Sequence, residues 1–358
     1  MSVVLVIMIY VSSFLCIGFD FTKIKYKKYV FNLFCFVLVI LASLKTADFS
    51  YDTKNYVMLY ETTPQLSQFI PYANGYEPGW VLLGLACRCL GFSYHVFFFI
   101  VAAISIGIYR YIILKKCSNI FIALFTYVSC FYFLNEMIIL RHGLATALVC
   151  LEIYFISENK KKYAFVCLLI GITIHSAAII GAFFFFIRLV KKPVYYFFIL
   201  LLPILLNDAV FIAVLSWCAD MYADKLPVLV FISKKIGNYL ELEASAGGIK
   251  TFILYSLDLL LIFILAINLP KKNAIDVYLI ENIIGLVLAA AFILAFTKVA
   301  SFARLNGLLL INRVMLSSAY LESFKRNKKE FVIMFVYLLM NTYIFLRQVF
   351  FNSGGNVF

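Results

Sequence analysis

The feature that most constrains this chain is a series of long apolar segments, each close to the length needed to cross a lipid bilayer. A helix needs about 20 mostly apolar residues to span a hydrocarbon core of about 30 Å. Lipid cannot satisfy open backbone N–H and C=O groups, so such segments must be helical. Of the 358 residues, 65% are hydrophobic and only 14% are charged, whereas a soluble domain carries about 25% charged residues. The sequence therefore predicts an all-α polytopic integral membrane protein.

We expect about ten transmembrane helices within a single membrane domain, 1–358. The expected crossings are residues 3–19, 29–45, 94–114, 119–135, 138–156, 193–210, 251–269, 276–297, 303–321 and 331–347. No positive residue precedes the first crossing and several lysines follow it, so we expect a retained span that enters with its N-terminus outside. An even number of crossings then returns the C-terminus to the same side.

The net charge of the chain is +13, and the distribution of its basic residues follows the predicted membrane topology. Basic residues gather in short loops between the apolar segments, which is the positive-inside pattern of cytoplasmic loops. The clusters are Lys23, Lys25, Lys27 and Lys28; Lys115 and Lys116; Lys160, Lys161 and Lys162; Arg188, Lys191 and Lys192; Lys271 and Lys272; and Lys325, Arg326, Lys328 and Lys329. This distribution indicates no nucleic-acid partner.

Residues 163–189 depart from the pattern, because a basic cluster flanks each end. Two full crossings do not fit, since each arm of about 13 residues reaches only about 20 Å. We expect a short intramembrane helical hairpin with His175 and Ser176 at its bend. Non-helical backbone at that depth requires burial in protein or a wet cavity, so a cavity is predicted. A further crossing hidden in the second outer segment is an alternative that also restores the topology.

Two long segments, 46–92 and 208–250, are expected outside, and both are rich in acidic residues. In the first, Asp52, Tyr56 and Tyr60 are four residues apart, so on a helix they share one face. Asp52 and Glu77 are candidate acids or bases. The alternative is that they are ordinary solvated charges and that the tyrosines belong to an interfacial aromatic belt.

Ionisable residues within or beside the crossings are the other candidates, because they are costly there and usually functional. A guanidinium suits phosphate because it presents a planar fork of donors and keeps its charge. The candidate arginines are Arg141, which precedes His142, and Arg304 and Arg313. The alternative for Arg141 is a structural ion pair with Glu136 or Glu152; for Asp258 and Glu281 we expect pairing or exposure at the interface.

His175 is a candidate base, although a lone histidine in an apolar segment is often a satisfied core residue. The nine cysteines show no metal-binding spacing, so we expect packing roles for them and no metal site.

Four motifs in order resemble the EpsG-type family of bacterial polysaccharide polymerases, which includes many Wzy-type O-antigen polymerases. They are Asp52-x-x-x-Tyr56-x-x-x-Tyr60, Glu77-Pro78-Gly79-Trp80, Leu140-Arg141-His142-Gly143-Leu144-Ala145 and Ile174-His175-Ser176-Ala177. They cover roughly residues 1–190. The family more often has glutamine where this chain has His142, which leaves the role of that position open.

The resemblance implies a C-type glycosyltransferase-like architecture in the bacterial inner membrane, with both termini periplasmic. It implies that oligosaccharide repeat units carried on undecaprenyl diphosphate are joined at the periplasmic face, most simply for O-antigen, with no cofactor and without a metal. Arg141 and Arg304 would meet the diphosphate, with His142, Arg313, Tyr56 and Tyr60 as further substrate-binding candidates. Asp52, Glu77 and His175 are the candidates for the general base. Membrane lipid and a chain-length regulator of the export system are the expected partners.

Three other functions remain open at this point. A flippase or transporter would show internal pseudo-symmetry, and no repeat is visible. A membrane O-acyltransferase also uses an intramembrane histidine, but its donor is cytoplasmic. An O-antigen ligase would share the carrier and differ in the acceptor.

Overall fold

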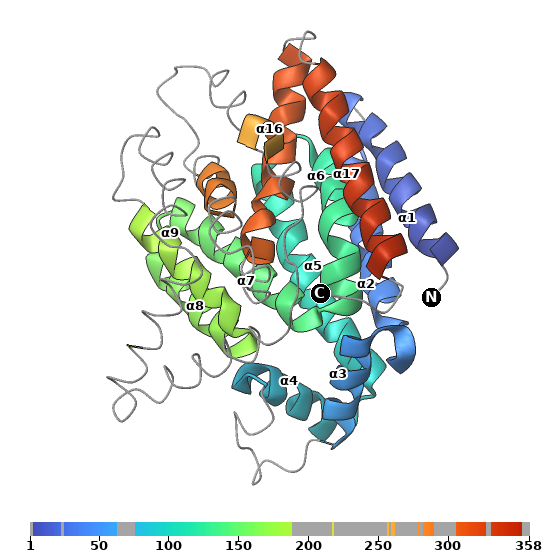
Figure 1. The fold of residues 1–358 in the computed structure, drawn as a ribbon, viewed down its shortest axis with the longest axis vertical. Coiled ribbons are helices and arrows are strands. Elements are labelled where there is room, and N and C mark those ends of the chain that lie inside the picture. Colours follow the sequence, from blue (N-terminus) through green and yellow to red (C-terminus); the bar gives the residue numbers. More distant parts are fainter. Residues whose placement is uncertain are drawn as a thin grey trace.

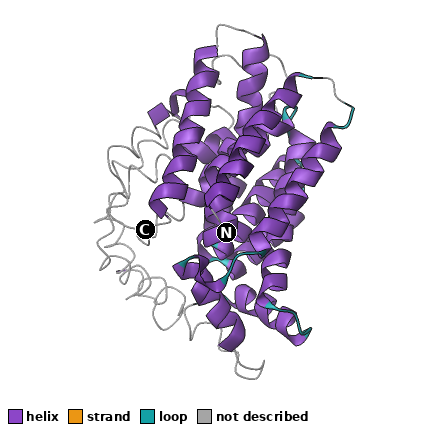
Figure 2. Ribbon diagram, turned by 90° about the vertical axis from the view of Figure 1, so that its right-hand side faces the viewer, coloured by secondary structure: helices purple, strands orange, loops and turns teal. Residues whose placement is uncertain are grey.

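The structure is a computed structural model that describes residues 3–22, 25–62, 76–187, 306–326 and 331–352, together with short pieces at 217, 256–257, 259–261, 278 and 282–289. Within these residues all regular secondary structure is helical, and no strand occurs (Figure 2). The prediction of an all-α membrane protein is confirmed at this level.

The helices follow in order along the chain (Figure 1). They are α1 (Val3–Cys16), η1 (Ile17–Phe21), α2 (Lys27–Ser43), η2 (Ala47–Phe49), α3 (Tyr51–Thr62), α4 (Pro78–Cys89), α5 (Tyr94–Lys116), α6 (Ile120–Tyr127), the π-helix η4 (Val128–Ile138), α7 (Leu140–Ser157), α8 (Lys161–Ile174), η5 (Ser176–Gly181), α9 (Ala182–Ile187), α16 (Asn312–Arg326) and α17 (Phe331–Asn352).

Among the described residues, five helical stretches are long and apolar enough to cross a membrane. They are Val4–Phe21, Tyr94–Lys116, Ile120–Ile138, Leu140–Ser157 and Val332–Phe350. They coincide with five of the expected crossings, and α2, of 17 residues, occupies a sixth. The expected crossings at 193–210, 251–269, 276–297 and 303–321, and the outer segment 208–250, lie wholly or partly outside the described residues. The count of ten therefore stays a prediction.

The centre of the bundle is formed by α6, η4 and α7, which are largely buried, whereas α1 and α17 are largely exposed. Large apolar side chains such as Leu15, Tyr29, Phe165 and Val332 are exposed on α1, α2, α8 and α17. In a bilayer such surfaces meet lipid chains, so their exposure carries no hydrophobic penalty.

The basic turns of the described chain meet at one end of the bundle. Lys116 Nζ lies 2.7 Å from Glu158 Oε1 and so joins the α5 and α7 ends. Lys325 donates to the Asp20 carbonyl at 2.8 Å and to Asn119 Oδ1, which joins η1, α6 and α16. Helices α3 and α4 lie at the opposite end (Figure 1). Basic turns at one end and helices α3 and α4 at the other match the predicted pattern, while the side of the membrane that each end faces stays a prediction.

Within 163–189 the chain turns at His175. Helix α8 ends at Ile174, and His175 is extended at φ −153° and ψ 121° before η5 and α9 begin. The 14 residues of α8 span about 21 Å, so the bend reaches the level of the first turns of α7. The bend thereby approaches α4 at the α3/α4 end of the bundle (Figure 1).

Candidate functional site at the hairpin bend

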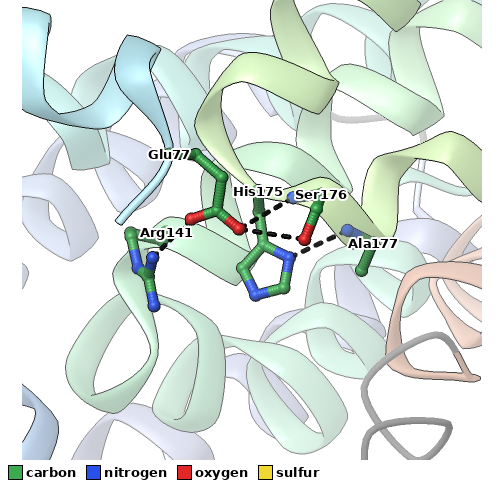
Figure 3. Close-up of polar contacts among 5 residues, drawn as sticks. All are labelled: Glu77, Arg141, His175, Ser176 and Ala177. Carbon is green, nitrogen blue, oxygen red and sulfur yellow. Dashed lines mark hydrogen bonds and ion pairs between the residues drawn. The ribbon is translucent and has the colours of Figure 1, made fainter. Parts of the chain in front are cut away.

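A buried carboxylate joins three elements at this bend. Glu77, directly before α4, is only 3% exposed. Its Oε2 accepts from Arg141 Nη1 of α7 at 2.5 Å. Its Oε1 accepts from the Ser176 backbone N–H at 3.1 Å and from the Ser176 hydroxyl at 3.0 Å (Figure 3). A buried charge persists only when it is paired and hydrogen-bonded in this way.

Helix termini supply further support for the Glu77 carboxylate. Arg141 lies in the first turn of α7, and Ser176 is the first residue of η5. Free N–H groups give the N-terminus of a helix a partial positive charge, which favours an anion there. The bend therefore forms an anion-accepting environment built from the Arg141 guanidinium and the hydroxyl and backbone amide of Ser176.

The position of Arg141 depends on the π-helix η4 that precedes it. Helix η4 ends at Ile138, and Ile139 leaves helical geometry at φ −105° and ψ 60° before α7 begins. Gly143 then packs against η4 so closely that a Cβ would lie 2.5 Å from the Asn135 carbonyl oxygen. Lys45 Nζ donates to the Glu136 carbonyl at 2.5 Å and satisfies one of the last acceptors of η4. These contacts hold the turn that presents Arg141.

Two tyrosines flank the guanidinium. The Arg141 Cζ lies 4.6 Å from the centroid of the Tyr76 ring and 5.9 Å from that of Tyr56, within cation–π range. Burial raises the pKa of Tyr76, whereas the positive charge of Arg141 lowers it. The Asp52 carboxylate raises the pKa of Tyr76 further, so Asp52 acts electrostatically on this cluster. Asp52 is half-exposed and lies one helical turn before Tyr56 on α3, so it is near the Arg141 end of that helix face.

His175 and His142 meet edge to face at the hairpin bend. Their ring centroids are 5.5 Å apart, and the rings are inclined by 85°. The Ala177 backbone N–H donates to His175 Nδ1 at 3.2 Å (Figure 3). Because Nδ1 accepts this bond, the neutral imidazole carries its proton on Nε2. In this tautomer Nε2–H is a hydrogen-bond donor, while Nδ1 already accepts from the Ala177 amide.

The other predicted site residues that the structure describes make contacts outside the Glu77 cluster. Tyr60 donates to the Phe92 carbonyl at 2.7 Å and stacks on Phe97 at 5.1 Å, so it anchors α3 to the start of α5. Arg313 of α16 is buried and donates to Cys130 Sγ of η4 at 3.7 Å, which is a contact outside the Glu77 cluster. Arg304, Asp258 and Glu281 lie outside the described residues.

The partner of Arg141 differs from the alternatives drawn from sequence. Neither Glu136 nor Glu152 pairs with it. The Glu136 carboxylate instead accepts from Ser105 at 2.7 Å and from Tyr127 at 2.9 Å. Its true partner, Glu77, is 64 residues away in the sequence, and local spacing cannot predict a contact over that distance.

Sequence reasoning also missed the roles of Tyr76 and Ser176. Each adjoins a residue that had been identified, Glu77 or His175, and that adjacency was the available signal. Among the described residues, no group of three or more His, Cys, Asp or Glu side chains is placed to hold a metal ion.

The fold and the site together define an α-helical membrane protein with a buried arginine–carboxylate pair and two histidines at the bend of a helical hairpin. A model of the EpsG family matches residues 28–358, nearly the whole chain, and the chain belongs to this family. Membership indicates a glycosyltransferase-like function of the polysaccharide-polymerase type. No curated protein and no solved structure matches the chain.

Proposed function

We propose that the protein is a polysaccharide polymerase that joins undecaprenyl-diphosphate-linked repeat units at the periplasmic face of the bacterial inner membrane, in O-antigen synthesis. The observation that carries the proposal is the Glu77–Arg141–Ser176 cluster. It places a guanidinium, 14% exposed in its side chain, at the end of the bundle opposite the basic turns. We expect the diphosphate headgroup of a lipid in the outer leaflet to reach this end of the bundle.

Arg141 is the proposed electrophilic group of the reaction. The leaving group is a lipid diphosphate, whose negative charge grows as its bond to the sugar breaks. A preorganised cation in a site with little water stabilises that charge far better than it would in bulk water. Arginine also offers two parallel donors to phosphate oxygens, which lysine cannot do. Arg304, which the sequence places beside the same outer face, is a second candidate for this role.

His175 is the proposed second donor to the diphosphate. Because Nδ1 accepts from the Ala177 amide, the neutral ring carries its proton on Nε2, and in the proposed complex this N–H donates to a diphosphate oxygen. Its partner His142 packs edge to face against the ring and restricts its rotation. The alternative role of His175, as the general base, stays a prediction.

Asp52 is the proposed general base. Glu77 is less suited, because both of its oxygens are engaged by donors and one faces Arg141. Asp52 is partly exposed and lies close enough to Tyr76 to raise the pKa of that phenol. A carboxylate at the mouth of the site can meet the acceptor glycan before the glycan reaches the buried arginine.

In the proposed step, the acceptor hydroxyl oxygen forms a bond to the anomeric carbon of the donor glycan. The bond from that carbon to the phosphate oxygen breaks, and its electron pair leaves with the lipid diphosphate. The hydroxyl proton passes to Asp52. We propose a metal-independent reaction within a C-type architecture of about ten crossings, with both termini periplasmic.

Deletion of the gene tests the proposal through the surface polysaccharide. A polymerase predicts lipid capped with single repeat units, restored to long chains by the wild-type gene. Complete loss of surface glycan would instead indicate a flippase or a ligase. Polymerisation by purified protein with chelator present tests metal independence, and loss of activity that added divalent cation restores would overturn that part.

A further inference from the structure

We propose that Gly79 is a positioning residue, whose lack of a side chain lets α4 dock on the end of α8 and seat Glu77 between Arg141 and Ser176. The expected effect of this residue on activity rests on the proposed function. The docking of α4 itself stands on geometry alone.

The contact between Gly79 and Thr173 leaves no room for a methyl group. A Cβ on Gly79 would lie 2.4 Å from Thr173 Oγ1, 2.8 Å from its Cβ and 2.9 Å from its carbonyl oxygen. The Thr173 hydroxyl already donates to the Ile170 carbonyl at 2.7 Å, so rotation of the side chain breaks that bond. The carbonyl oxygen belongs to α8 and cannot move without the helix. A side chain at position 79 must therefore push α4 away from α8.

That displacement acts directly on the site. Gly79 lies two residues after Glu77, and Thr173 lies three residues before Ser176. Pro78, between Glu77 and Gly79, restricts the backbone and leaves little slack to absorb a shift. The two bonds from Ser176 to Glu77 are already 3.0 and 3.1 Å long. A shift of about 1 Å takes both beyond hydrogen-bonding distance.

Loss of those bonds would release the carboxylate that orients Arg141. Glu77 then acts as a positioning group and not as the base, since its role is to connect the guanidinium to the hairpin bend. Misplacement of a catalytic contact by about 1 Å lowers a rate by about 100-fold. We expect a loss of that order for Gly79→Ala.

Gly84→Ala is the matched control. Gly84 lies on the same helix, and alanine favours the helix at either position. A Cβ on Gly84 meets only the Tyr60 ring, at 3.7 Å, which is ordinary van der Waals contact. The two variants therefore differ in the contact with α8 and share the change in helix propensity.

Two measurements on the purified full chain test the inference. The first is the rate of polymerisation of lipid-linked repeat units. The second is the rate at which a cysteine at the neighbouring half-buried Ala177 (Ala177→Cys), in a background without other cysteines, reacts with a maleimide in detergent solution. This substitution keeps both bonds from Ser176 to Glu77, and the readout needs no activity. We expect Gly79→Ala to speed labelling and slow polymerisation about 100-fold, while Gly84→Ala matches the parent in both.

The inference is overturned if Gly79→Ala matches the parent in labelling, if labelling changes with polymerisation unaffected, or if Gly84→Ala is equally damaging. Faster labelling of the Gly79→Ala variant, together with a parent protein that does not polymerise, would support the docking contact. That result would refute the proposed function instead.

Discussion

Removal of the Arg141 guanidinium should abolish polymerisation, and the structure shows why the single variant Arg141→Ala is not sufficient evidence. Arg141 neutralises Glu77, whose side chain is only 4% exposed. Breaking a buried pair from one side costs about 3–5 kcal/mol, because it leaves an uncompensated charge. Inactivity of Arg141→Ala would therefore not distinguish a loss of folding from a loss of substrate binding.

The double variant Arg141→Ala, Glu77→Gln separates the two effects. Glutamine keeps an oxygen to accept from Ser176 and removes the unpaired charge. We expect thermal unfolding of the double variant in detergent to recover most of the stability lost by Arg141→Ala. Activity should stay low, because one charge-assisted contact to the leaving group contributes about 2–4 kcal/mol in the transition state. This corresponds to a loss of about 30-fold to about 900-fold.

The assay is chain elongation from lipid-linked repeat units, resolved by gel, with protein level and melting temperature measured on the same preparation. The single variant Glu77→Gln is the control that shows the effect of replacing the carboxylate with an amide. A double variant that is stable and polymerises at the parent rate would refute the role of Arg141 on the substrate. The pair would then be structural only. Arg141→Lys should recover part of the activity, since it restores the charge without the two-pronged geometry.

Further predictions address other parts of the molecule. Asp52→Asn should lower the rate by about 100-fold to 10⁴-fold at unchanged stability, as expected for loss of a general base; near-normal turnover would exclude Asp52. His175→Gln, which keeps a donor, should retain more activity than His175→Ala, and equal activities would return His175 to a packing role. Cysteines placed at positions 322–330, at the basic cluster that follows α16, should resist labelling from outside intact cells, and rapid labelling would contradict the predicted topology. Asp20→Ala should destabilise the fold by about 1–3 kcal/mol, because its carboxylate accepts from the Phe121 and Ile122 amides at 3.0 and 2.9 Å; an unchanged melting temperature would contradict this.

Much of the membrane architecture was accessible from sequence because it depends on local composition. A long apolar segment must be helical in lipid wherever its neighbours lie, and the observed spans at Tyr94–Lys116 and Leu140–Ser157 follow that rule. Arg141 and His175 could be selected singly, since an ionisable group in an apolar segment is costly in itself.

The pairings within the site were decided by the tertiary structure. Glu77 meets Arg141 and Ser176 across 64 and 99 residues, and no pattern along the chain specifies such a contact. The accepted bond at His175 Nδ1, which makes the ring a donor, depends on the backbone leaving helical geometry at the bend. The need for glycine at position 79 arises only when α8 is packed against it. Hydropathy therefore determined which segments enter the membrane, whereas side-chain packing between distant segments determined which polar groups meet there.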